Sequence, residues 1–293
     1  MLTRRDKQRL LLGTGVIGLL ALAVAACWPI WSEIASIGLN DPENSHILLA
    51  IPVAGFLAWL RRGRIRKMPW GPSPMGPILC LLGLGLVATG PVLAFDAFSH
   101  LGALLLALGA VSSMLGFEVL TRFKPAVLSL FFLLPVPGGI RQGIALPLQE
   151  ISARFVEFSM DLFGITVLRT GNALSINGVD VAVAEACNGM RMVSALALVT
   201  VAFVFSVPMR NSVRLVFIAL SPAVALVVNI VRLVPTVLFY GYSDPETADF
   251  FHDVSGWGAL AVALAILSGV LWLLRWIEVP LAPYPVFAGK EAR

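Results

Sequence analysis

Apolar runs long enough to cross a lipid bilayer recur along this chain and constrain its architecture more than any other feature. They cover residues 10–31, 47–60, 77–95, 101–120, 125–136, 190–207, 213–240 and 259–276. About 20 apolar residues in a helix span the hydrocarbon core of a membrane. Only 13% of the 293 residues are charged, roughly half the share of a soluble domain. The sequence therefore predicts an all-α polytopic membrane protein with about eight transmembrane helices.

Basic clusters predict how these helices are oriented. The clusters lie at residues 4–9, 61–67, 122–124 and 210–214, and at Arg275. Cytoplasmic loops of membrane proteins carry an excess of Lys and Arg. With an uncleaved first helix, a cytoplasmic N-terminus and eight crossings, every cluster falls on the cytoplasmic side. We therefore expect a single integral membrane domain, residues 1–293, with both termini in the cytoplasm.

The longest polar segment, about residues 138–185, then lies on the extracytoplasmic side. Apolar residues at helical spacing over 146–162 alternate with charged ones, which predicts an amphipathic helix on the membrane face or packed on the bundle. Three β-prone runs follow, at residues 166–170, 173–177 and 179–183. Asn177-Gly178 is the strongest short signal for a hairpin turn. We expect a small β-hairpin insert before the sixth span.

The hairpin leads to Cys187, which begins the sixth span at its outer end. Backbone N–H groups and the helix dipole at such a position favour the nucleophilic thiolate. Gly189 leaves the first turn open to a substrate carbonyl. The alternative is that Cys187 is an inert small residue at a helix start. Cys27 and Cys80 lie inside apolar runs and are expected to be small buried hydrophobes; no Cys/His spacing predicts a metal site, and no cofactor is expected.

Arg232 is the second unusual residue, because a charged side chain within a span is by default a hypothesis for a functional site. It lies roughly 28 Å along a helix counted from Val213, near the outer edge of the bilayer. Asn229, one turn earlier, indicates a polar inner surface. An arginine that only reaches the lipid headgroups is the alternative.

His252 is the third, in the polar loop expected before the eighth span. It can serve as a general acid or base, or it can be an ordinary solvated residue, as we expect for His46 and His100. Cys187, His252 and Arg232 form a chemically sensible set for acyl transfer. The histidine takes or holds the thiol proton, and the arginine stabilises the oxyanion.

Three motifs resemble those of the exosortase/archaeosortase family. They read E-A-C-N-G-M-R at residues 185–191, N-I-V-R at 229–232 and H-x-x-x-G at 252–256. The family's first motif is usually E-A-C-S-G-L-R, so Asn188 and Met190 depart from it. The similarity runs from about residue 41 to residue 257.

This resemblance implies a membrane-embedded cysteine transpeptidase or protease of the bacterial inner membrane, with its active site facing the periplasm. Cys187 would be the nucleophile, Arg232 the oxyanion- or substrate-stabilising residue and His252 the general acid/base. His252 stands where archaeal relatives usually carry Arg, which indicates the bacterial exosortase branch. Supporting positions are Glu185, Asn188, Gly189, Arg191, Asn229 and Gly256.

The implied partners are exported proteins that end in a sorting signal. That signal is a short motif of the PEP-CTERM kind, a transmembrane helix and a basic tail. The enzyme would cleave near the motif through a thioester and transfer the protein to an anchor; no nucleic-acid partner is expected. A plain hydrolase is possible within the enzyme class. A transporter, or a structural assembly factor for exopolysaccharide export with Arg232 as an anion site, is the alternative from another class.

Overall fold

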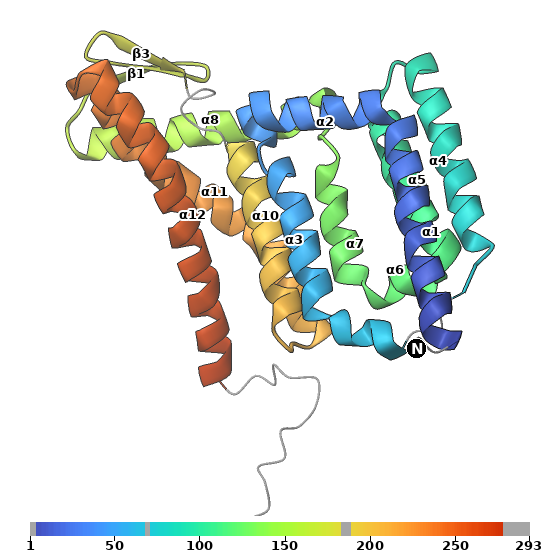
Figure 1. Cartoon of the computed structure of the whole chain (residues 1–293). Coiled ribbons are helices and arrows are strands. Elements are labelled where there is room, and N and C mark those ends of the chain that lie inside the picture. Colours follow the sequence, from blue (N-terminus) through green and yellow to red (C-terminus); the bar gives the residue numbers. More distant parts are fainter. Residues whose placement is uncertain (1–3, 68–70, 183–188, 278–293) are drawn as a thin grey trace, which may run out of the picture. The chain divides into compact units, whose positions relative to one another are not determined.

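The computed structural model is built mostly of helices and describes residues 4–67, 71–182 and 189–277 (Figure 1). The chain divides into two compact units, Met1–Pro137 and Gly138–Arg293. Within the described residues, five helices are long and apolar enough to cross a membrane. The number rises to seven if each of two bent helix pairs is one span. The prediction of a helical multi-pass membrane protein is confirmed, whereas the count of eight spans stays a prediction.

The first unit is helical throughout its described part. Its elements are α1 (Arg4–Ala26), α2 (Trp28–Asn40), η1 (Pro42–Asn44), α3 (Ile47–Leu60), η2 (Arg62–Lys67), α4 (Met75–Val92), α5 (Asp96–Leu115), α6 (Glu118–Arg122), α7 (Lys124–Leu130) and η3 (Phe131–Leu133). Glycines let α4 and α5 approach closely. A β-carbon on Gly83 would lie 2.7 Å from the main-chain oxygen of Gly102. Lipid supplies no hydrophobic driving force between membrane helices, so the helices associate largely through close packing. Small residues at the contact let their backbones approach.

The first predicted span is not one straight helix. α1 and α2 are bent by 77° at a break around Cys27. Pro29 stands in the first turn of α2 and has no N–H to donate to a carbonyl four residues earlier, so the chain starts a new helix there. Cys27 itself is buried among Ala23 and Ala103, as its apolar surroundings predicted.

The second unit carries every predicted site residue. Its described elements are α8 (Gly138–Leu162), β1 (Val167–Thr170), β2 (Ala173–Ile176), β3 (Val179–Ala182), α10 (Gly189–Ser206), α11 (Asn211–Tyr242) and α12 (Pro245–Trp276). α10, α11 and α12 share one apolar core, in which Leu196, Phe217 and Ala263 are fully buried. This core fixes α11 against α12, the two helices that carry Arg232 and His252.

The β-prone runs form a three-stranded antiparallel sheet in the order β1-β2-β3, rather than the single hairpin that we expected. Val167 pairs with Ile176, and Ala173 pairs with Ala182. Asn177 and Gly178 connect β2 to β3 with φ values of 53° and 80°. A two-residue type I′ turn requires positive φ at both of its central positions, and Asn-Gly tolerates this best.

One face of this sheet is buried against α8 and α11. The shared core consists of Ala153, Val156 and Met160 of α8, Val167, Leu174, Ile176 and Val181 of the sheet, and Leu233 and Val237 of α11. The opposite side of α8 exposes Ile151, Phe155 and Phe158. Of the two placements expected for the amphipathic helix, the structure shows packing on its own unit through one face. The sheet thereby rests on the half of α11 that follows Arg232.

Candidate active site

The first motif lies at the edge of the described chain. β3 ends at Ala182 and α10 begins at Gly189, so Glu185, Cys187 and Asn188 lie outside the described residues. Arg191 stands in the first turn of α10 and is half-buried. The described ends of β3 and α10 therefore flank the predicted nucleophile.

α11 positions the second motif. Asn229 is only 2% exposed, and Arg232 follows it by about one turn. The hydroxyl of Thr236 donates to the main-chain oxygen of Arg232 at 2.9 Å. Pro235 stands inside the helix, where it removes one backbone hydrogen bond of that turn. Asn229 is buried in α11, which fits the predicted polar inner surface rather than a surface that faces only lipid.

His252 lies in a helix and not in the loop that we expected. α12 begins at Pro245, and the carboxylate of Asp244 caps it by accepting from the backbone N–H of Thr247 at 2.9 Å. This hydrogen bond, together with a second one from the hydroxyl of Thr247 at 2.9 Å, holds the pKa of the Asp244 carboxyl below its ordinary value. An aspartate followed by proline is a recognised start signal for helices. That signal was present in the sequence, and it places His252 in the third turn of α12.

The structure brings the second and third motifs together through the main chain of α12. Nη1 of Arg232 donates to the main-chain oxygen of His252 at 3.4 Å. The hydroxyl of Ser255 donates to the same oxygen at 3.0 Å. Gly256 lies against the same guanidinium, because a β-carbon there would be 3.3 Å from Nη1. Ser255 is a neighbour that motif reasoning missed, since a single serine carries no spacing signal.

The imidazole of His252 is mostly enclosed, with 20% of its side chain exposed. Its Nδ1 lies 3.4 Å from Oδ1 of Asp253. Its Nε2 is buried and has no hydrogen-bond partner among the residues that the structure describes. A buried ring nitrogen without a partner is costly unless something else engages it.

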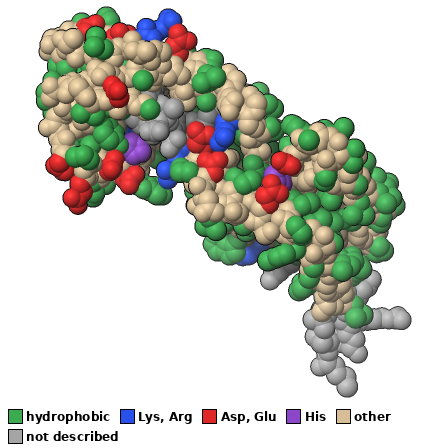
Figure 2. Space-filling model, turned by 90° about the horizontal axis from the view of Figure 1, so that it is seen from above, with side chains coloured by type: hydrophobic (Ala, Val, Ile, Leu, Met, Phe, Trp, Pro, Cys, Tyr) green, Lys and Arg blue, Asp and Glu red, His purple; other side chains and the backbone are tan. Residues whose placement is uncertain are grey.

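Two side-chain contacts hold the part of α12 around His252 against α11. The rings of Phe239 and Phe251 stack with centroids 4.1 Å apart, and the hydroxyl of Tyr240 donates to Asp249 at 2.8 Å. The N-cap and first turns of α12 also carry four exposed carboxylates, at Asp244, Glu246, Asp249 and Asp253. Figure 2 shows histidine side chains beside acidic ones on the face seen from above. Both a carboxylate, that of Asp253, and the guanidinium of Arg232 therefore lie close to His252.

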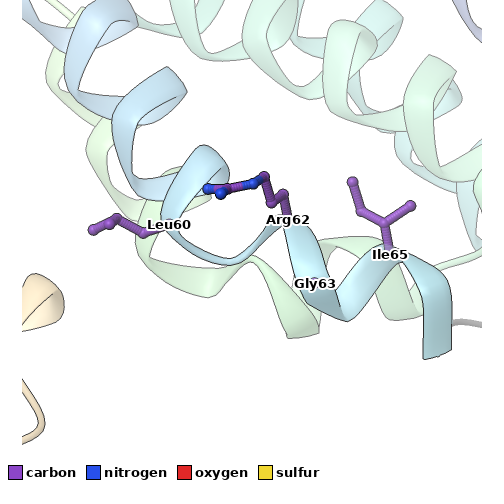
Figure 3. A pocket seen from close by; sticks show the side chains of 4 residues that line it. All are labelled: Leu60, Arg62, Gly63 and Ile65. Atoms are coloured by element: carbon purple, nitrogen blue, oxygen red, sulfur yellow. The ribbon is translucent and has the colours of Figure 1, made fainter.

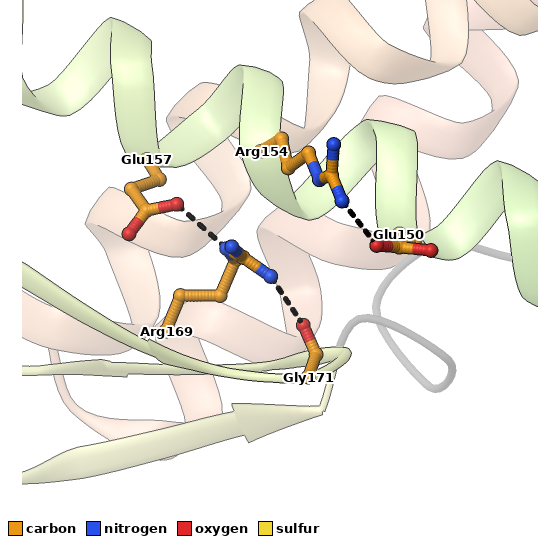
Figure 4. Close-up of polar contacts among 5 residues, drawn as sticks. All are labelled: Glu150, Arg154, Glu157, Arg169 and Gly171. Carbon is orange, nitrogen blue, oxygen red and sulfur yellow. Dashed lines mark hydrogen bonds and ion pairs between the residues drawn. The ribbon is translucent and has the colours of Figure 1, made fainter.

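Polar contacts fasten the sheet to the helices of its unit. Nε of Arg169 on β1 donates to Oε2 of Glu157 on α8 at 2.6 Å, and its Nη1 donates to the carbonyl of Gly171 (Figure 4). The side-chain amide of Asn177 donates to the carbonyl of Gly241, near the end of α11, at 3.2 Å. The turn between β2 and β3, at the opposite end of β3 from the first motif, is thus tied to the helix that carries Arg232.

The first unit has a cavity of its own. It has a volume of about 630 Å³ and is lined by Leu60, Arg62, Gly63 and Ile65 (Figure 3). The guanidinium of Arg62 lies over the ring of Trp59, 4.3 Å from its centroid. The lining residues that the structure describes all belong to the first unit, so we do not assign this cavity to the active site.

Two other histidines lie in the first unit and differ from expectation. His46 and His100 are each 3% exposed, although polar surroundings in the sequence predicted that they would be solvated. Nε2 of His100 lies 3.5 Å from Oε1 of Glu33 on α2. Helix α2 packs near the start of α5, and this tertiary contact contributes to the burial of His100.

Fold and site together define a multi-pass helical membrane protein in which an arginine of one long helix meets the histidine-bearing turn of the next. The family described as transmembrane exosortase matches residues 30–269. This match covers most of the chain and includes all three motifs, so the chain belongs to the transmembrane exosortase family. Curated proteins and solved structures gave no significant match.

Proposed function

We propose that this protein is a cysteine transpeptidase of the bacterial inner membrane that processes C-terminal sorting signals. Its substrates are exported proteins that end in a short motif, a transmembrane helix and a basic tail. The observation that carries the proposal is the family match, which includes Cys187, Arg232 and His252. The contact between Arg232 and the main chain of His252 supports it, because it unites two of the three motifs in one place.

The proposed reaction is a two-step acyl transfer. The thiolate of Cys187 attacks a peptide carbonyl of the sorting signal, and the thiol proton passes to the imidazole of His252. Arg232 stabilises the oxyanion that forms. The C–N bond then breaks, the leaving amine takes the proton from His252, and a thioester to Cys187 remains. An amine on the anchor attacks the thioester and restores the free thiol; attack by water would make the enzyme a hydrolase.

The structure offers two features that suit these roles. The guanidinium of Arg232 lies beside the turn of α12 that carries His252, so a positive charge is already close to the imidazole when negative charge develops. Nε2 of His252 is enclosed and lacks a partner among described residues, which suits an atom that exchanges a proton with the thiol or the substrate. Glu185, Asn188, Gly189 and Arg191 would support the start of α10 around the nucleophile.

The proposed topology has eight spans with both termini in the cytoplasm and the active site in the periplasm. It rests on the basic clusters, which all fall on the cytoplasmic side with this arrangement. A sorting signal whose basic tail stays inside displays its motif on the outer face, where this topology puts Cys187. Cysteine labelling at single introduced positions in intact cells tests each loop separately.

Substitution of Cys187 tests the catalytic proposal. In cells that make both the enzyme and a protein with a C-terminal sorting signal, Cys187→Ala should abolish processing, a loss of roughly 10⁴-fold or more. Cys80→Ala is the matched control, because Cys80 lies in α4 of the first unit; it should process normally. Hydroxylamine should release the substrate from wild-type enzyme by cleaving the thioester. Undiminished processing by Cys187→Ala would refute the enzyme and favour a transport or assembly role.

A further inference from the structure

Gly256 and the main-chain carbonyl of His252 both lie against Nη1 of Arg232. A β-carbon on Gly256 would lie 3.3 Å from Nη1, and no other atom outside its own turn and neighbours comes within 4 Å of that position in the described structure. The same Nη1 donates to the His252 carbonyl at 3.4 Å. Gly256 follows His252 by four residues, so the carbonyl and the missing side chain lie one above the other on one face of α12.

A contact of 3.3 Å to a β-carbon is tighter than ordinary van der Waals contact, which begins near 3.5 Å. A side chain at position 256 would therefore push the guanidinium away from the His252 carbonyl. Because that hydrogen bond is already long at 3.4 Å, a shift of a few tenths of an ångström breaks it. Ser255 donates to the same carbonyl, so the oxygen would keep a partner while Arg232 lost one.

We propose that Gly256 is a positioning residue: its lack of a side chain forms, together with the His252 carbonyl, a seat on α12 for the guanidinium of Arg232. The seat couples Arg232 of α11 to the helix turn that carries His252. It sets where the guanidinium lies relative to the imidazole. Its catalytic consequence rests on the proposed function, whereas the seat itself is a matter of packing and is testable without any substrate.

The packing test is a double-mutant cycle between positions 256 and 232. Gly256→Ala should lower the midpoint of thermal unfolding in detergent by about 2–5 °C relative to Gly258→Ala. Gly258 is a matched control, because it lies two residues on in α12 and a β-carbon there would meet nothing within 4 Å. The helix propensity gained from alanine is the same at both positions and cancels in the comparison.

Removal of Arg232 gives the decisive outcome. In an Arg232→Ala background, Gly256→Ala and Gly258→Ala should have equal midpoints, because the guanidinium that the new methyl group would displace is gone. Arg232→Met carries the same prediction if the alanine variant does not accumulate. Two results would contradict the proposal. The first is equal unfolding midpoints for Gly256→Ala and Gly258→Ala in the protein that keeps Arg232. The second is a difference between these two variants that persists after Arg232 is removed.

The catalytic test uses processing rates normalised to folded protein. Gly256→Ala should reduce kcat by about 10-fold and Gly256→Leu by about 100-fold, because misplacing a stabilising group by about 1 Å costs on this order. KM should change less than twofold, because the oxyanion forms only during the chemical step and is absent from the bound substrate. Gly258→Ala and Gly258→Leu should stay within twofold of wild type. A rise in KM at constant kcat would contradict positioning of Arg232, whereas processing by Cys187→Ala would refute the enzyme without touching the unfolding result.

Discussion

Replacement of Gly241 by alanine should destabilise the second unit, although alanine is the better helix former. Gly241 lies near the end of α11, directly beneath the tip of the sheet. A β-carbon there would stand 2.7 Å from Cγ2 and 2.9 Å from Cγ1 of Ile176. Ile176 is 1% exposed and packs in the core that the sheet shares with α8 and α11, so it cannot move out into solvent.

Two opposing free-energy terms decide how much Gly241→Ala changes the stability of the protein. Alanine in place of glycine in a helix contributes up to about 1 kcal/mol. Overpacking of a filled core costs typically 1–3 kcal/mol, and the upper half of that range applies because the conflict is with branched atoms of a buried residue. The shift also strains the hydrogen bond from Asn177 to the Gly241 carbonyl. A net loss of about 1–2 kcal/mol follows, which lowers the unfolding midpoint by roughly 2–8 °C.

Thermal unfolding of the purified protein in detergent measures this loss, and hydrogen exchange locates it. Exchange should rise in strand β2 and its turn before it rises in α12. Ile176→Ala removes the conflicting atoms, so Gly241→Ala should be harmless or slightly stabilising in that background. Gly269→Ala is the control, since a β-carbon there meets nothing within 4 Å. A Gly241→Ala variant as stable as the wild type would refute the reasoning that the sheet is seated on α11.

Two further outcomes follow from the structure. Gly83→Ala should lower the unfolding midpoint, because its β-carbon would lie 2.7 Å from the Gly102 oxygen, whereas Gly85→Ala in the same helix should be tolerated. Asp244→Ala should lower the midpoint at pH 7, because the cap of α12 is lost. The folded-state pKa of Asp244 is depressed, so its stabilisation is complete above the unfolded pKa of about 4 and disappears as pH falls through the lower folded value. Wild type and Asp244→Ala should therefore converge in acid; a deficit constant with pH would contradict the cap.

Hydropathy and charge sufficed for the class of protein, since spans depend on local composition. The turn at Asn177-Gly178 was also readable, because positive φ is a local property that few residues accept. The start of α12 is signalled by Asp244-Pro245, although the polar composition around these residues predicts a loop. A charged helix turn and a polar loop have similar composition, and only the capping signal separates them.

The bend between α1 and α2 at Cys27 differs from the sequence prediction of one continuous span for another reason. An apolar run predicts that residues prefer lipid or core, but it does not say whether they form one helix or two. Pro29 supplied the local cause of the break, yet proline is also common in membrane helices that remain whole. The packing of α1 and α2 against α5 decided between these outcomes.

The sequence alone specified the chemical identities in the candidate site, because Cys187, Arg232 and His252 each stand in a recognisable motif. The tertiary structure decided how two of those motifs meet. Arg232 and His252 are 20 residues apart and come together through a main-chain carbonyl, which no side-chain pattern can reveal. The missing side chain at Gly256 has meaning only when a second helix inserts a guanidinium beside it. Such contacts depend on how α11 and α12 pack against each other. The local preferences of individual residues do not predict that packing.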